Sequence, residues 1–198
     1  MPFVIVIDGS NFINSLCRAK KDANYMLNIL SLPKLQNLIQ QRLNNGGLAG
    51  HPFLHTYFIC SNKQKLGCLK GEFRDQFIEK LIHSTGVTVD IIEHGQTSEG
   101  KEEEVDMHVF IKMLEMGPLS HTRDAWRHIV LISSDKDFVP AIRILSNLGT
   151  HTVTVGMNDK NQYPQELINE SFLFINLSEL LDEMEQNPLP PELASKMK

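Results

Sequence analysis

The sequence predicts one α/β domain with a mainly parallel sheet and helices on both of its faces. Three observations lead to this fold class. Short apolar runs alternate with amphipathic segments along the 198 residues, an order that favours parallel strands joined by right-handed crossovers. The runs are apolar at nearly every position, as in strands that are buried on both faces. Hydrophobic residues make up 41% of the chain, which is enough to build a core around such a sheet.

The first predicted elements are a strand and two segments that can become helical. Residues 3–7 form a short apolar run, and residues 9–11 are turn formers that can begin a short helix. Residues 17–32 are polar and irregular, so we expect either a mobile loop or an inserted helix there. Pro33 suits the first turn of a helix that continues to about Leu43 with apolar residues on one face.

The middle of the chain continues the alternation. A second strand is predicted over 51–60, a helix over 70–83 and a third strand over 87–92. Residues 94–101 form a polar loop, and residues 105–116 form the next helix. The side chains expected to point inward from the helix over 70–83 are Phe73, Phe77, Ile78, Leu81 and Ile82.

The last third supplies the remaining strands. A fourth strand is predicted over 128–132, followed by a helix over 136–148 and a fifth strand over 152–155. A short helix near 164–168 then leads to a sixth strand over 172–175.

A final helix over 178–185 completes a domain that we place at residues 1–186. Residues 187–198 contain three prolines and are expected to form a flexible tail. No apolar run approaches the roughly 20 residues that span a bilayer, so no contact with a membrane is expected.

The three cysteines, Cys17, Cys60 and Cys68, are odd in number and contain no close pair in the sequence. We interpret them as reduced thiols, neither a disulfide framework nor a zinc site. The amino terminus leads directly into a strand-like run and lacks the basic segment of a secretory signal. The sequence therefore predicts a cytoplasmic protein.

Acidic residues follow two of the predicted strands. If the strand order is 3-2-1-4-5, the first and fourth strands are neighbours, and Asp8 and Asp135 end side by side. The carboxyl ends of parallel strands meet at the edge of the sheet where such folds bind ligands. Asp137 lies close to Asp135 in the sequence, and Asp106 would approach from the side of the third strand.

Carboxylates gathered in one crevice repel each other unless a cation joins them, and Mg²⁺ or Mn²⁺ is the usual partner of such oxygen ligands. An ion held in this way can activate water against a phosphodiester. Each acid also has an ordinary role as a turn former or as an early helix residue, and Ser134 with Asp137 fits a variant of the capping box. These alternatives stay open for each residue taken singly.

The formal net charge of −5 argues against tight, nonspecific binding of a nucleic acid duplex, but it leaves RNA open as a substrate. Arg18, Lys20 and Lys101 lie near the acids in the sequence and can steer a phosphate backbone. A second basic group, which includes Lys70 and Arg74, follows the second strand. No glycine-rich nucleotide-binding motif occurs, which disfavours a nucleotide-dependent enzyme.

Taken together, three segments resemble the NYN family of PIN-like ribonuclease domains: Asp8-Gly9-Ser10-Asn11, Val105-Asp106 and Ser133-Ser134-Asp135-Lys136-Asp137-Phe138. The resemblance covers about residues 3–177 and implies a three-layer, Rossmann-like fold of the PIN-like type. It also implies a Mg²⁺- or Mn²⁺-dependent endoribonuclease, a hydrolase that acts on RNA. The residues implied as catalytic acids and metal ligands are Asp8, Asp106, Asp135 and Asp137. Asn11 and Ser134 would orient ligands or substrate.

The resemblance has one departure. The family often carries a lysine shortly before Val-Asp, whereas Glu103 and Glu104 occupy those places here and the nearest lysine is Lys101. We therefore keep a noncatalytic RNA-binding or protein-recruiting module as the alternative function. A phosphatase with Asp8 as nucleophile ranks third, because Ser10 stands where such enzymes carry a second aspartate. Single-stranded RNA is the expected partner, and a homodimer is left open.

Overall fold

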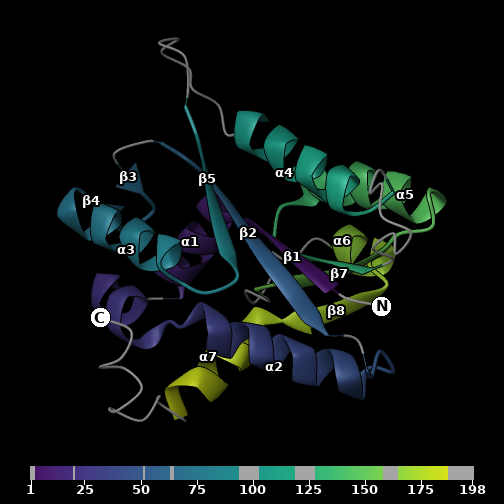
Figure 1. Ribbon diagram of the computed structural model, residues 1–198, viewed down its shortest axis with the longest axis horizontal. Helices are drawn as coiled ribbons and strands as arrows, with labels where there is room; N and C mark the ends of the chain where they lie inside the picture. Colours follow the sequence, from purple (N-terminus) through teal and green to yellow (C-terminus); the bar gives the residue numbers. More distant parts are fainter. Residues whose placement is uncertain are drawn as a thin grey trace.

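A six-stranded parallel sheet forms the centre of the protein (Figure 1). The computed structural model describes residues 3–19, 21–50, 52–62, 65–93, 103–118, 128–157 and 165–186. Across the sheet, the strands are β5 (Val87–Ile92), β2 (Phe53–Ser61), β1 (Phe3–Asp8), β6 (His128–Ile132), β7 (His151–Gly156) and β8 (Leu173–Asn176). Every neighbouring pair is parallel. The expected order of the first five strands is confirmed, and the sixth extends the sheet beyond the fifth.

Helices cover both faces of the sheet, which gives the expected three layers (Figure 1). One face packs against α1 (Gly9–Arg18), α2 (Leu32–Asn45), α3 (Glu72–Ile82) and α7 (Leu177–Gln186). The other packs against α4 (Glu103–Met116), α5 (Val139–Asn147) and α6 (Gln165–Glu170). Alternate residues of β1 enter the two cores because successive side chains of a strand point to opposite faces. This burial on both faces explains why β1 is apolar at every position before Asp8.

The segment over 17–32 contains a short helical stretch, which is one of the two expected alternatives. Helix α1 continues through Arg18, and a π-helical turn, η1 (Tyr25–Ile29), lies just before α2. The ammonium group of Lys80 on α3 donates to the carbonyl oxygens of Met26, Leu27 and Leu30, at 3.1, 2.7 and 2.6 Å. These bonds satisfy carbonyls that the end of a helix leaves without partners, and they tie the segment to the fold.

The region around α3 differs from expectation in two ways. A short antiparallel hairpin, β3 (Lys65–Leu66) and β4 (Leu69–Lys70), precedes the helix. Phe73 and Ile82 are both 55% exposed, so they do not point inward as expected. At about 100° per residue, these two positions fall on opposite margins of the apolar stripe, and Phe77, Ile78 and Leu81 between them fill the core.

The expectation of three reduced thiols is wrong. Cys17, at the end of α1, forms a disulfide with Cys68 in the β3–β4 turn, with their Cα atoms 5.9 Å apart. The pair is separated by 51 residues, and only the hairpin brings Cys68 back onto α1. Cys60 on β2 is a free, buried thiol.

Within the described ranges, no helix is both long enough and apolar enough to cross a membrane. The polar loop over 94–101 and the proposed tail over 187–198 lie outside the described residues, so the boundary of the domain at residue 186 stays a prediction.

Candidate active site

Asp8 is the most deeply buried carboxyl group at the carboxyl edge of the sheet. It ends β1, it is only 2% exposed, and its side chain caps α1. Its Oδ1 accepts a hydrogen bond from the backbone N–H of Asn11 at 3.0 Å, and its Oδ2 accepts one from Ser133 Oγ at 3.0 Å. Both oxygens are therefore held in place by neighbouring elements.

Gly9 allows α1 to begin directly after Asp8. A Cβ atom at this position would lie 2.8 Å from the carbonyl oxygen of Ile59 and 2.5 Å from a ring carbon of Phe58. Both residues belong to β2, the neighbour of β1, so a side chain here would push α1 away from the sheet. The glycine thus fixes the geometry between strand and helix that makes Asp8 a cap.

The pKa of Asp8 is raised from 3.8 to about 7, mainly by burial and to a smaller extent by the negative charges of Asp106 and Asp135. The hydrogen bonds from Asn11 and Ser133 act in the opposite direction because they favour the ionised carboxylate. The carboxylates of Asp106 and Asp135, which belong to different elements, therefore both raise the pKa of the buried Asp8 carboxyl group. The charges of Asp106 and Asp135 thus reach Asp8, while the convergence of these acids on one cation stays a prediction.

Asp106 approaches the site from one face of the sheet, whereas α1 lies on the other face. It lies in the first turn of α4 and is partly buried. Val105 and Val109 on the same helix are fully buried against Val4 and Val6 of β1. This packing places the start of α4 beside the carboxyl end of β1, although the two are far apart in the sequence.

Asp135 and Asp137 take different positions after β6. Asp135 caps the short 3-10 turn η2 (Lys136–Phe138), where its Oδ1 accepts a hydrogen bond from the N–H of Asp137 at 2.9 Å. Asp135 is partly buried, whereas Asp137 is exposed. Asp135 therefore caps a helical turn and also raises the pKa of Asp8, whereas Asp137 lies at the outer margin of the site.

Ser133 is a site residue that the sequence did not reveal. It is 2% exposed, its hydroxyl donates to Asp8, and the same oxygen accepts from the N–H of Asp135 at 3.1 Å. It thus links the acids of two neighbouring strands. A serine after a strand is an ordinary turn residue, so only the pairing of β1 with β6 shows this role.

Asn11 and Ser134 join α1 to the turn after β6. The side-chain oxygen of Asn11 accepts from the N–H of Ser134 at 2.9 Å, and Ser134 Oγ accepts from the N–H of Met157 at 3.0 Å. The alternative of Ser134 as a helix cap is wrong, because its hydroxyl bonds to the end of β7 and Asp135 is the cap. Both residues position the backbone around the acids.

The basic residues expected at the site are not gathered there by the described part of the chain. Arg18 ends α1, about 15 Å along the helix axis from the end that Asp8 caps, at 1.5 Å per residue. Lys20 and Lys101 lie outside the described residues. Their contact with a substrate stays a prediction.

The acids suit a divalent cation in their chemistry, although they do not form a closed metal centre. Across the described ranges, no three His, Cys, Asp or Glu side chains come together where a metal ion could be held. A carboxylate offers about four lone-pair sites, so the two hydrogen bonds to Asp8 leave others for a ligand. Burial is the main reason for the raised pKa of Asp8, and the nearby charges of Asp106 and Asp135 add to it; a hard cation bound there would favour the ionised carboxylate.

Comparison with known proteins identifies the family. The family model of the NYN domain matches residues 2–179, nearly the whole chain. The chain belongs to the NYN domain family. NYN domains are PIN-like nucleases, which places the chain in an RNA-related nuclease family of hydrolases. A search of curated proteins gave no match.

A solved structure shares the fold of this NYN domain. The crystal structure of a protein of unknown function from Vibrio parahaemolyticus aligns with a TM-score of 0.61 and 16% sequence identity. The alignment covers 90% of this chain and 94% of the other. The likeness supports the PIN-like architecture of the NYN domain.

Proposed function

We propose that this NYN domain is a metal-dependent endoribonuclease that hydrolyses phosphodiester bonds of single-stranded RNA. The observation that supports it most is the buried carboxyl group of Asp8, on which the charges of Asp106 and Asp135 act at the carboxyl edge of the sheet. In open α/β sheets, this edge is where ligands bind. Carboxylates that lie near one another repel each other, and a bound cation would relieve this repulsion.

In this proposal, Asp8, Asp106 and Asp135 hold Mg²⁺ or Mn²⁺, with Asp137 at the exposed margin of the acidic set. Such an ion, when bound, lowers the pKa of a water and stabilises the charge that develops on the phosphate. The side chains of the protein orient the acids. Asn11 and Ser133 hold both oxygens of Asp8, so that the carboxylate keeps its orientation while the charge around it changes.

The positioning bonds of Asn11 and Ser134 support the same proposal. They connect α1, the turn after β6 and the residue that follows β7, and so hold these three segments together around the acids. Arg18, Lys20 and Lys101 complete the proposal as residues that steer the phosphate backbone.

Assembly as a homodimer and a cytoplasmic location remain parts of the proposal, to be tested by sedimentation and by imaging of the tagged protein.

The test is cleavage of a circular single-stranded RNA with Mn²⁺, because a substrate without ends reports only endonuclease action. We expect Asp8→Asn and Asp135→Asn to lower the rate roughly 100-fold or more, since even partners outside the ligand set cost 10 to 100-fold in metal enzymes. Asp182→Asn, an exposed carboxylate on α7, serves as the control and should cleave like the wild type. Undiminished cleavage by the first two variants would exclude the proposed site.

The second candidate is a noncatalytic RNA-binding or protein-recruiting module. It is favoured by Glu103 and Glu104 in place of the family's lysine, and by the open spacing of the described acids, of which no three form a metal cluster. RNA binding that persists in a chelator, together with no cleavage at any Mn²⁺ concentration, would select this candidate. The phosphatase alternative gains no support, because Asp8 is almost fully buried with both oxygens hydrogen-bonded.

A further inference from the structure

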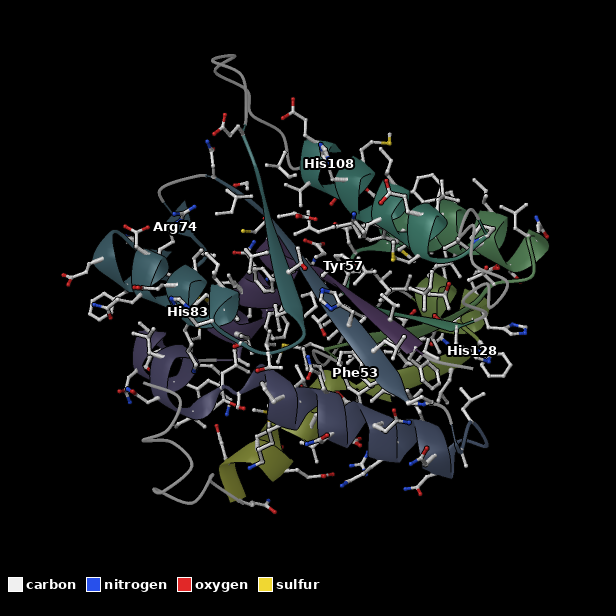
Figure 2. The ribbon with its side chains drawn as sticks, viewed as in Figure 1. Phe53, Tyr57, Arg74, His83, His108 and His128 are labelled. Carbon is white, nitrogen blue, oxygen red and sulfur yellow. A yellow bond between two sulfur atoms is a disulfide. The ribbon has the colours of Figure 1, made fainter. Side chains whose placement is uncertain are left out.

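Arg74 is a largely buried cation whose hydrogen-bonding capacity is only partly used. It lies in the first turn of α3, beside the β3–β4 hairpin (Figure 2). Its side chain is 14% exposed. Within the described part of the chain, its buried Nε has no hydrogen-bond acceptor. Its Nη1 donates to Oδ1 of Asp75 at 2.9 Å, and the side chain of Asp75 is 70% exposed.

The position of Arg74 relates it directly to the acidic site. Cys60 follows Ile59 on β2, and Ile59 is the residue of β2 that pairs with Asp8. Burial raises the pKa of the Cys60 thiol to about 11, and the positive charge of Arg74 lowers it while the negative charge of Asp8 raises it. The charges of Arg74 and Asp8 therefore both shift the pKa of the Cys60 thiol. Arg74 lies one strand away from the acids, at the same edge of the sheet.

The energetics of this arrangement point to a missing anion. A buried guanidinium group loses hydration, and it regains that free energy only from well-placed acceptors. The exposed carboxylate of Asp75 supplies little of it, since ion pairs with exposed partners contribute little to stability. A phosphodiester offers two acceptor oxygens in the spacing of the guanidinium fork.

We propose that Arg74 binds a backbone phosphate of the RNA adjacent to the phosphate at Asp8. The inference rests on the proposed function for its substrate, but it concerns binding and not the chemical step. Arg74 supplies a positive charge beside the acidic crevice, and it fixes the path of the strand across the carboxyl end of β2. In the free protein Asp75 accepts a hydrogen bond from the guanidinium group, and the phosphate replaces Asp75 as the acceptor when RNA binds.

The experiment measures the binding of a fluorescent single-stranded RNA by anisotropy, in EDTA, over a series of salt concentrations. We expect Arg74→Gln to weaken binding about tenfold at low salt, the loss of one charge-assisted contact. One phosphate contact fewer also lowers the slope of log K against log salt by about 0.7. Arg143→Gln is the matched control, because it removes the same charge from an exposed arginine on α5 and should leave the slope unchanged.

Asp75→Asn removes the exposed carboxylate that pairs with Arg74, so its effect on RNA binding should be opposite to that of Arg74→Gln. It frees Arg74, so RNA should bind severalfold more tightly to Asp75→Asn than to the wild type. The gain should disappear when Arg74→Gln is present, and Arg74→Lys should recover the slope but only part of the affinity. A merely structural role for Arg74 would change the melting temperature without changing the salt slope.

The outcomes separate this inference from the proposed function. An unchanged slope in Arg74→Gln, or no binding of RNA by the wild type at low salt, overturns the role of Arg74, whether or not RNA is cleaved. Binding that depends on Arg74, combined with no cleavage in Mn²⁺, overturns the nuclease proposal and leaves the phosphate contact in place.

Discussion

Asp8 is held in a place where water cannot solvate its charge. In the unfolded chain this carboxyl group releases its proton near pH 3.8, whereas in the fold it releases the proton near pH 7. Between these values the folded protein binds a proton that the unfolded chain has lost. The contribution of Asp8 to the free energy of unfolding of the metal-free protein therefore falls as the pH rises from about 4 to about 7, and it stays low above that range.

Asp8→Asn should remove this pH dependence. At pH 8 in EDTA we expect the variant to be more stable than the wild type by on the order of 2–4 kcal/mol, because an amide has no charge to desolvate. At pH 4 the difference should nearly vanish, since Asp8 is then protonated in both states. Urea denaturation at the two pH values measures it, with the exposed Asp137→Asn as control. An equal difference at both pH values would contradict the assignment.

At the scale of elements, the junction between β1 and α1 depends on close contact with β2. Gly9→Ala places a methyl group against the carbonyl oxygen of Ile59, which cannot move without disturbing the sheet. We expect a loss of about 1–3 kcal/mol in the free energy of unfolding, the usual cost of overpacking. Gln41→Ala on the exposed face of α2 should stay within about 0.5 kcal/mol of the wild type. Equal stability of the two variants would show that α1 can shift freely.

The disulfide between α1 and the hairpin makes a second prediction at this scale. Closing a loop of 51 residues restricts the unfolded chain, so reduction of Cys17–Cys68 should cost roughly 2–4 kcal/mol. Urea denaturation with and without dithiothreitol measures the effect. The Cys17→Ser, Cys68→Ser double variant is the control, because the reductant should not change its stability. A wild type that is insensitive to dithiothreitol would mean that the bond does not form in solution.

At the scale of the whole molecule, the acids come from elements that only the complete sheet brings together. Binding of Mn²⁺ should therefore stabilise the fold as a unit, by about 2.7 kcal/mol at 100 times the dissociation constant. The stabilisation should grow as the pH rises from 6 to 8, because Asp8 must lose its proton to act as a ligand. Thermal melting measures this, and the effect should be absent in the Asp8→Asn, Asp135→Asn double variant and intact in Asp182→Asn.

The sequence predicted the sheet because each long strand carries its own apolar run. The strand order follows from the alternation with helices, and it puts Asp8 and Asp135 after neighbouring strands. The roles of Asp8, Asp106 and Asp135 as metal ligands stay a prediction. The hairpin was missed because strands of two residues have no detectable period. Cys17 and Cys68 were missed because their pairing depends on that hairpin. Ser133 and Arg74 were named only as members of a motif and of a basic group, because their burial and contacts depend on neighbouring elements that local sequence does not encode.

The bond between Ser133 and Asp8 joins residues that the ribosome adds 125 positions apart. At about 5–20 residues per second, roughly 6–25 s pass between the synthesis of the first partner and the synthesis of the second. During that interval β1 has emerged without β6, its neighbour on one side. A growing polypeptide therefore lacks half of the acidic crevice, and under the proposed activity the messenger RNA being translated is not cut by its own unfinished product.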